Sequence, residues 1–189
     1  MGINRNSRRA VFLDRDGVIN GAVVHGGKPH PPACLQQLEL LPGVAAALQR
    51  LRKAGYLIIV VTNQPDVARG TQSRHVVEAI HERLASLLPI DDFRVCYHDD
   101  DDACACRKPK PGLILDAARA HDVDLGSSVM VGDRWRDVEA GRRAGCATVF
   151  IDCGYQERQP QRPDAVFGSL PEAADWILSR APGTTHEAC

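Results

Sequence analysis

Residues 10–17, Ala10-Val11-Phe12-Leu13-Asp14-Arg15-Asp16-Gly17, decide the fold, because an apolar run passes directly into two acids and a glycine. The apolar residues predict a short buried strand, and Asp-x-Asp-Gly predicts a tight loop at its end. In an extended chain Asp14 and Asp16 point to the same side, and Gly17 permits a sharp turn after them. The two carboxylates could hold Mg²⁺ or serve as nucleophile and general acid/base, although a solvated turn would have the same sequence.

The composition is that of an ordinary globular protein. The chain has 189 residues, of which 44% are hydrophobic and 25% charged, which predicts one domain with a sizeable core. A net charge of −1 gives no reason to expect nucleic acid or an anionic membrane as a partner. No apolar run reaches the ~18 residues of a transmembrane helix, and residues 10–13 are too short for a signal-peptide core. We therefore expect a cytoplasmic protein with an N-terminal extension (1–9), a single domain (10–180) and a flexible tail (181–189).

Strand and helix patterns alternate along the rest of the chain. Residues 21–42 are rich in glycine and proline and predict an irregular loop. Further strands are predicted at 56–61, 93–96, 129–131, 147–151 and 165–167, and helices at 44–53, 71–88, from 111, around 138–144 and at 171–180. Repeated βα units predict a doubly wound, three-layer α/β/α Rossmannoid fold with a mainly parallel sheet.

Polar residues follow three of the predicted strands. Asp14 and Asp16 follow the first, Thr62 and Asn63 the second, and Asp133 the fourth. In open α/β sheets ligands bind outside the carboxyl ends of the strands, so these side chains can converge there. Three carboxylates suit Mg²⁺, which prefers oxygen ligands.

The stretch 107–112, Arg-Lys-Pro-Lys-Pro-Gly, places fixed positive charge just before a predicted helix. Such a place favours anions through both the cations and the helix dipole. By itself the stretch could be a basic surface turn. Opposite a carboxylate cluster that binds a metal, it predicts a phosphate-binding segment.

A second constellation is formed by cysteines and a histidine. Cys96, His98, Cys104 and Cys106 lie within eleven residues and could close a tetrahedral, structural Zn²⁺ site, the alternative being incidental cysteines. This pattern fits a reducing compartment better than a disulfide scaffold. The acidic run 99–102 inside the loop predicts a solvated surface, or a weak attraction for a substrate ammonium group.

Taken together, these motifs resemble the haloacid dehalogenase (HAD) superfamily of phosphohydrolases. The resemblance covers residues 10–151 and rests on four motifs in order, namely Asp14-x-Asp16-Gly17, Thr62-Asn63, Lys108-Pro109-x-Pro111 and Gly132-Asp133-x-x-x-Asp137. The fuller strings at 14–20, 62–64 with 68–70, and 106–109 more narrowly resemble the histidinol-phosphate and heptose-bisphosphate phosphatase branch.

The resemblance implies phosphoryl transfer in two steps through an aspartyl-phosphate. Asp14 would be the nucleophile, and Asp16 would protonate the leaving oxygen and then activate water. Mg²⁺ would be held by Asp14, the backbone carbonyl of Asp16, and Asp133.

The same resemblance implies further roles around the phosphoryl group. Thr62 and the backbone N–H of Asn63 would bind its oxygens, and Lys108 would neutralise them while pairing with Asp14. Asp137 would position Lys108 or a metal-bound water. The branch also has a zinc loop, here 96–106.

Specificity is expected to come from loops, because the spacing of the motifs leaves no room for a cap domain. Loops 21–34, 64–70 and 96–106 would surround the site. Four cations are predicted to be spare and available to a second substrate phosphate, namely Arg69, Arg107, Lys110 and Arg134. Two departures from the branch affect this region: Arg134 replaces a usual lysine, and residues 65–67, Pro-Asp-Val, replace a usual run of small residues.

The sequence thus predicts a Mg²⁺-dependent phosphatase of carbohydrate metabolism, a monomer with structural zinc. The resemblance implies D-glycero-D-manno-heptose 1,7-bisphosphate as the substrate and heptose 1-phosphate as the product. Histidinol phosphate, another sugar phosphate or a phosphorylated nucleic acid end stay open, the last being disfavoured by the net charge. Two alternatives from other classes are a receiver-like switch that keeps its acyl phosphate and a zinc-stabilised binding domain that hydrolyses nothing.

Overall fold

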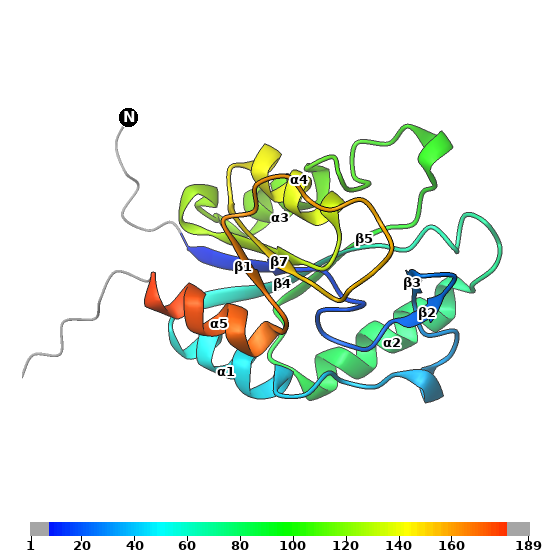
Figure 1. Ribbon diagram of the computed structural model, residues 1–189, viewed down its shortest axis with the longest axis horizontal. Helices are drawn as coiled ribbons and strands as arrows, with labels where there is room; N and C mark the ends of the chain where they lie inside the picture. The colour runs from blue at the N-terminus through cyan, green and yellow to red at the C-terminus, as the bar shows by residue number, and fades with distance from the viewer. Residues whose placement is uncertain (1–7, 181–189) are drawn as a thin grey trace, which may run out of the picture.

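The computed structural model describes residues 8–180 and places a six-stranded sheet between two layers of helices (Figure 1). The strands follow the spatial order β5-β4-β1-β6-β7-β8, and all neighbouring pairs are parallel. Their bounds are β1 (Arg9–Leu13), β4 (Tyr56–Asn63), β5 (Asp92–Cys96), β6 (Val129–Gly132), β7 (Ala147–Ile151) and β8 (Ala165–Phe167). The predicted doubly wound α/β class is confirmed.

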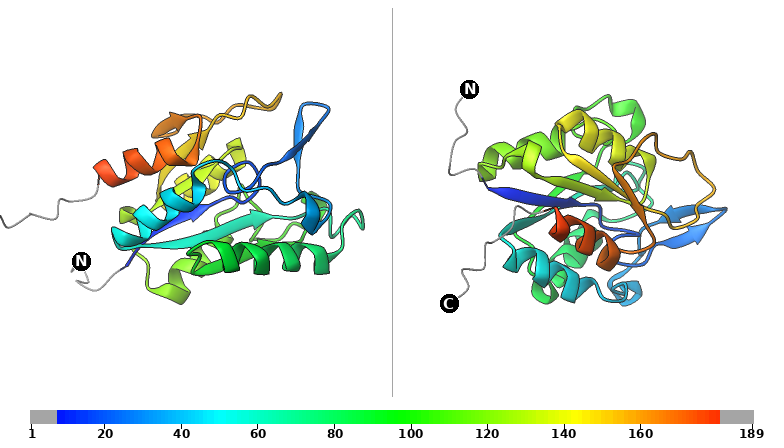
Figure 2. Two further views of the ribbon diagram at one scale, coloured as in Figure 1. Left: turned by 90° about the horizontal axis from the view of Figure 1, so that it is seen from below. Right: turned by 60° about the vertical axis from the view of Figure 1, so that its left-hand side comes forward.

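Helices cover both faces of the sheet (Figures 1 and 2). One face packs against α1 (Val44–Lys53), α2 (Arg74–Leu87) and α5 (Leu170–Ser179), and the other against α3 (Gly112–His121) and α4 (Trp135–Ala144). The central strands are therefore buried on both sides, which explains why β1 and β4 read as continuous apolar runs rather than alternating ones. No helix within residues 8–180 is both long and apolar enough to cross a membrane.

The prediction of an irregular loop over residues 21–42 is wrong in part. Strands β2 (Val23–His25) and β3 (Lys28–His30) form an antiparallel hairpin, and η1 (Leu35–Gln37) is a short 3-10 helix. Gly26 and Gly27 form the two-residue turn with φ of 58° and 74°, the left-handed conformation that such hairpins require. The glycines, which by themselves predict only an interruption of regular structure, form the turn of this hairpin.

Most other boundaries agree with the prediction to within one or two residues. A larger shift is seen in α2, which begins at Arg74 instead of residue 71. The backbone N–H groups of Thr71 and Gln72 both bond to the carbonyl of Asp66, so these residues close the preceding loop. Of the predicted terminal segments, residues 1–7 and 181–189 lie outside the described residues, and β1 begins at Arg9, one residue before the predicted domain start.

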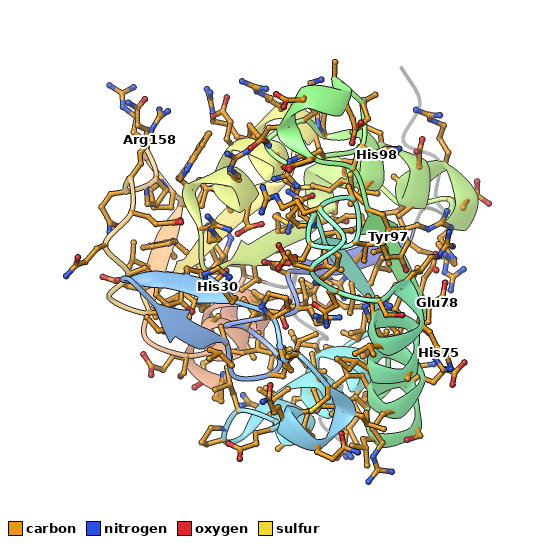
Figure 3. All side chains as sticks on the ribbon, turned by 90° about the vertical axis from the view of Figure 1, so that its right-hand side faces the viewer. His30, His75, Glu78, Tyr97, His98 and Arg158 are labelled. Atoms are coloured by element: carbon orange, nitrogen blue, oxygen red, sulfur yellow. The ribbon has the colours of Figure 1, made fainter. Side chains whose placement is uncertain are left out.

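The carboxyl ends of β1, β4 and β6 meet at one edge of the sheet, because Leu13 pairs with both Val60 and Val131. Figure 3 looks onto this end of the molecule. His30 from β3, His98 from the segment after β5, and Arg158 from the loop after β7 lie around it. The site described below is built on this edge.

Candidate active site

Asp14 and Asp133 are brought together by the ends of β1 and β6. The backbone N–H of Asp14 bonds to the carbonyl of Val131 at 2.9 Å, which continues the ladder between these strands. Gly17 has φ of 85°, and a Cβ atom there would lie 2.0 Å from Asp133 Oδ2. A Cβ atom on Gly132 would lie 2.1 Å from the Cβ of Asp137. Only glycine at these two positions lets the carboxylates approach one another.

Lys108 provides the buried cation of the site. Its side chain is 2% exposed, and Nζ lies 2.9 Å from Asp14 Oδ1 and 2.6 Å from Asp137 Oδ1. Nζ also donates to the carbonyl of Val61 at 2.7 Å. Burial lowers the pKa of Lys108, but the charges of Asp137 and Asp14 outweigh it, so the pKa is raised and the amine stays charged. Asn63 holds the backbone of Lys108 through two hydrogen bonds of 3.1 Å, one in each direction.

Asp14, Asp133 and Asp137 form a cluster in which one carboxylate oxygen from each residue lies within 4.8 Å of the other two. Both oxygens of Asp133 are buried and form no hydrogen bond of good geometry with residues 8–180, although the hydroxyl of Tyr155 is near enough to Asp133 to have a lowering effect on its pKa. Burial, together with the neighbouring carboxylates, raises the pKa of Asp133 and also that of Asp14. Buried oxygens without partners are expensive, so this donor set fits a hard cation such as Mg²⁺.

The carboxylate of Asp16 faces a different set of groups. Oδ1 accepts from Arg15 Nε (3.1 Å) and Asn20 Nδ2 (2.9 Å), and Oδ2 accepts from Arg15 Nη2 (2.9 Å) and Gln64 Nε2 (2.9 Å). Burial raises the pKa of Asp16, but the charge of Arg15 and these hydrogen bonds outweigh it and lower the pKa. The pKa values of the two neighbouring carboxyl groups are therefore shifted in opposite directions in the metal-free protein, that of Asp14 upwards and that of Asp16 downwards.

A cleft of about 430 Å³ opens in front of these residues. Asp14, Asp16, Asn63 and Asp133 line its floor. Thr62, by contrast, is buried beneath the cleft, and its Oγ1 accepts from Gln64 Nε2 at 3.0 Å. The remaining lining residues come from the β2-β3 hairpin, the loop after β4, the loop after β5, the start of α4 and the loop after β7.

Arg69 and Arg107 are ion-paired in the structure and are not free cations, while their predicted role in binding a second phosphate stays a prediction. Arg69 binds Asp99 through Nε and Nη2, both at 2.6 Å, and Arg107 Nε lies 2.8 Å from Asp100 Oδ1. Arg136 Nη1 reaches the same oxygen of Asp100 at 3.1 Å. The acidic run is therefore not simply a solvated surface, because two of its members neutralise arginines that line the cleft.

The other two predicted cations are also paired. Arg134 forms a two-pronged ion pair with Glu157, with Nε 2.8 Å from Oε2. Lys110 Nζ donates to the carbonyls of Ala103 and Cys104, so it stabilises the cysteine-rich loop and does not line the cleft. Glu157 belongs to the loop 152–164, which the sequence analysis overlooked because its polar composition carries no motif.

The loop 152–164 adds Glu157 and Arg158 to the wall of the cleft. The guanidinium of Arg158 lies over the ring of Trp135, 4.6 Å from its centroid, and this contact attaches the loop to the start of α4. A fourth loop thus surrounds the cleft besides the three predicted ones.

Cys96, His98, Cys104 and Cys106 come together after β5. Their sulfur and Nδ1 atoms are separated by 3.2 Å (Cys96–Cys106), 3.3 Å (His98–Cys106), 3.4 Å (Cys104–Cys106), 3.6 Å (Cys96–His98) and 3.7 Å (Cys96–Cys104). Ligands around a tetrahedral Zn²⁺ with Zn–S bonds of about 2.3 Å are roughly 3.5–3.8 Å apart. The four residues therefore fit a closed zinc site with no position left for substrate.

Comparison with known proteins gives concordant matches. The family model described as HAD-hydrolase-like matches residues 105–173. The D-glycero-β-D-manno-heptose-1,7-bisphosphate 7-phosphatase of Bordetella bronchiseptica is 36% identical, with 87% of this chain and 89% of the relative covered. The D-glycero-α-D-manno-heptose-1,7-bisphosphate 7-phosphatase of Mycobacterium bovis is 43% identical, with coverages of 75% and 78%.

A similar solved structure is that of the D,D-heptose 1,7-bisphosphate phosphatase from B. bronchiseptica complexed with magnesium and phosphate. It has a TM-score of 0.78 and 34% sequence identity, and the match covers 92% of this chain and 99% of that one. The resemblance inferred from the sequence motifs is thus confirmed over almost the whole fold.

Proposed function

This chain belongs to the HAD-like phosphatases and is a phosphoric monoester hydrolase, and from this premise we propose that it removes the 7-phosphate of a heptose 1,7-bisphosphate through an aspartyl-phosphate on Asp14. The observation that carries the proposal is the position of Asp14, whose carboxylate faces the cleft beside Lys108 and the buried carboxylate of Asp133. A nucleophile in that place meets a phosphoryl group that enters the cleft.

Mg²⁺ would be held by Asp14, Asp133 and the backbone carbonyl of Asp16, as the cluster of buried oxygens supports. When bound it would supply positive charge to the phosphoryl oxygens and to the carboxylate nucleophile. Lys108 contributes the second fixed charge, and Asp137 holds Lys108 through the 2.6 Å ion pair. The backbone N–H of Asn63, at the end of β4, would donate to the same oxygens, and the hydroxyl of Thr62 would do so from beneath the floor of the cleft, where its oxygen accepts from Gln64.

In the first half-reaction a carboxylate oxygen of Asp14 attacks phosphorus, and the bond between phosphorus and the sugar oxygen breaks. The electron pair of that bond stays on the sugar oxygen, which takes a proton from Asp16. Because each oxygen of Asp16 already accepts two N–H groups, one donor must move away before Asp16 can carry this proton. The first product is an alcohol, and Asp14 holds the phosphoryl group.

In the second half-reaction water attacks the phosphorus of the aspartyl-phosphate. Asp16 takes a proton from this water, the bond between phosphorus and Asp14 breaks, and inorganic phosphate leaves. The ionised form favoured by the lowered pKa of Asp16 is the form needed for this step. Asp14 returns to a carboxylate and Asp16 regains its proton, so the cycle closes without another reactant.

A second phosphate on the substrate is proposed to bind Arg107 and Arg134, with Arg69 nearby. All three line the cleft, and each is held by a carboxylate from Asp99, Asp100 or Glu157. Such pairs are partly exposed and can be exchanged for a phosphate, which binds guanidinium groups more strongly than one carboxylate does. This preference supports a bisphosphate over a monophosphate.

We further propose that Zn²⁺ fixes the loop 96–106, because the ligand spacing suits the ion and the loop carries no Val, Leu, Ile, Met, Phe or Trp that could anchor it in the core. We treat residues 10–180 as one catalytic domain that acts as a monomer in the cytoplasm, on a small metabolite and without nucleic acid or membrane. The free cysteines within residues 8–180 support a reducing compartment.

The proposal is tested by phosphate release from both anomers of heptose 1,7-bisphosphate, histidinol phosphate, hexose phosphates and a 3′-phosphorylated oligonucleotide in the presence of Mg²⁺. We expect one heptose bisphosphate to have the highest kcat/KM and Asp14→Asn to abolish the activity. Selective turnover of another compound would overturn the substrate but keep the reaction, and a stable phosphoprotein without turnover would favour the switch. A folded protein that neither reacts nor becomes labelled would favour the binding domain.

A further inference from the structure

Arg15 lies between the two catalytic acids in the sequence, yet its side chain is fully buried, with 0% exposed. Its Nε and Nη2 donate to the two oxygens of Asp16, and its Nη1 lies 2.9 Å from Nε2 of His81. A buried guanidinium is stable only where its N–H groups and its charge are matched. Arg15 therefore links Asp16 at the edge of the cleft to His81 in the interior.

His81 lies on the face of α2 that packs against the sheet, together with Val77, Ile80 and Leu84. It is 8% exposed, and its ring stacks on Phe93 of β5 with centroids 4.7 Å apart. Burial and the charge of Arg15 lower the pKa of His81 to about 3, so the ring is neutral at neutral pH. Its Nε2 can then accept a hydrogen bond from Arg15, with the proton on Nδ1.

The four donors to Asp16 differ in strength. Arg15 supplies two charge-assisted hydrogen bonds, whereas Asn20 and Gln64 each supply one neutral amide N–H. When Asp16 gives or takes a proton, a neutral amide is the easier donor to displace. The bonds from Arg15 then keep the carboxylate oriented, provided that Arg15 itself cannot turn.

We propose that His81 is a positioning residue for the reaction: it holds Arg15 in place, and Arg15 holds the carboxylate of Asp16 in the orientation for proton transfer. This inference rests on the proposed role of Asp16 as general acid and base. His81 lies beneath the cleft, outside its lining residues, so it acts only through Arg15.

The test uses two substrates that differ in their need for a general acid. Phenyl phosphate has a poor leaving group that must be protonated, whereas p-nitrophenyl phosphate has a good one that departs without a proton. If His81 positions Asp16, His81→Leu should lower kcat/KM for phenyl phosphate by about 10-fold to 100-fold, the effect of a small misplacement, and lower it less for p-nitrophenyl phosphate. His81→Gln can place an acceptor oxygen near the position of Nε2 and should retain most of the wild-type rate on both.

The control is His75→Gln, on the exposed side of the same helix, which should change neither rate (Figure 3). Equal losses on the two substrates for His81→Leu, or equal losses for His81→Gln and His81→Leu, would overturn the proposal. If His81→Leu does not fold by circular dichroism, His81→Asn replaces it, because its shorter amide cannot reach Arg15. Equal rates for His81→Gln and His81→Asn would then overturn the proposal.

Asp16→Asn separates this inference from the mechanism on which it rests. Asp16→Asn should lower kcat/KM for phenyl phosphate more than kcat/KM for p-nitrophenyl phosphate, as His81→Leu does, and the loss should be larger than in His81→Leu. If Asp16→Asn shows no such selectivity, the proposed role of Asp16 fails, and the role of His81 fails with it. If the wild type hydrolyses both aryl phosphates but not heptose bisphosphate, the proposed substrate is wrong. The test of His81 on the two aryl phosphates is still valid in that case.

Discussion

Lys108→Met should destabilise the metal-free protein more than any single change of a surface charge. The methionine keeps the length of the side chain but removes the ammonium group that contacts Asp14 at 2.9 Å and Asp137 at 2.6 Å. At an effective dielectric constant of about 20, each of these pairs has a gross attraction of roughly 6 kcal/mol. Most of it is offset by the desolvation of the lysine, and removing one partner of a buried pair costs about 3–5 kcal/mol.

The assay is urea unfolding followed by circular dichroism, in EDTA and in saturating Mg²⁺. In EDTA we expect Lys108→Met to lower the free energy of unfolding by about 3–5 kcal/mol, because the buried carboxylates lose their cation. In Mg²⁺ the loss should be smaller, since bound metal favours the folded state. The control Lys53→Met removes an exposed lysine at the end of α1 and should change the free energy by less than about 0.5 kcal/mol.

Turnover by Lys108→Met should also fall by about 10²-fold to 10³-fold, the usual effect of removing one group that stabilises charge in a transition state. If Lys108→Met in EDTA is as stable as the wild type, the account of a buried carboxylate cluster compensated by this lysine is wrong. If Lys108→Met lowers the free energy of unfolding equally in EDTA and in Mg²⁺, the view that the metal and the lysine share the same carboxylates is wrong.

The remaining predictions concern other parts of the site. The pKa of His81 is about 3 in the folded protein and about 6.5 in an unfolded chain. Between about pH 3 and about pH 6.5 the imidazole is therefore protonated in the unfolded chain but not in the folded protein. Wild type should therefore lose stability as the pH falls from about 6.5 towards 3, and urea midpoints of His81→Gln should fall less steeply; parallel curves would contradict this. Cys104→Ser should lower the zinc content, expected to be about one ion per chain by elemental analysis, and leave the sheet folded; unchanged zinc would exclude the cluster as the site. Arg107→Met should raise KM for the bisphosphate by about 10-fold or more and leave KM for p-nitrophenyl phosphate unchanged; equal effects would place Arg107 outside a second phosphate site.

The sheet and the acidic centre were predictable because their signals are local. Continuous apolar runs mark strands buried on both faces, and the motif Asp14-x-Asp16-Gly17 marks the end of the first one. Once the strands were known to be parallel, their carboxyl ends had to meet at one edge, which brought Asp133 towards Asp14. The close approach of these acids also has a local signal, the glycines at positions 17 and 132.

The ionic environment of the cleft was not predictable, because it depends on contacts between distant segments. Arg69 and Asp99 are thirty residues apart, and Arg134 and Glu157 twenty-three, so nothing in the sequence shows that they pair. His81 gave a weak signal, since it lies at helical spacing among the apolar residues of α2, where a histidine is more often a packed core residue than a functional one. Only the structure, which places Arg15 Nη1 next to Nε2 of His81, shows what the imidazole of His81 contacts.

The most direct test of the central claim is a search for the phosphoryl group on Asp14 during turnover. Wild type is mixed with heptose 1,7-bisphosphate and Mg²⁺, quenched in acid within the first turnover and digested, and the peptide containing Asp14 is analysed by mass spectrometry. The account predicts one phosphoryl group on this peptide at early times, its decay as phosphate is released, and its absence in Asp14→Asn. Release of phosphate without any phosphorylated peptide, or turnover by Asp14→Asn, would contradict the account.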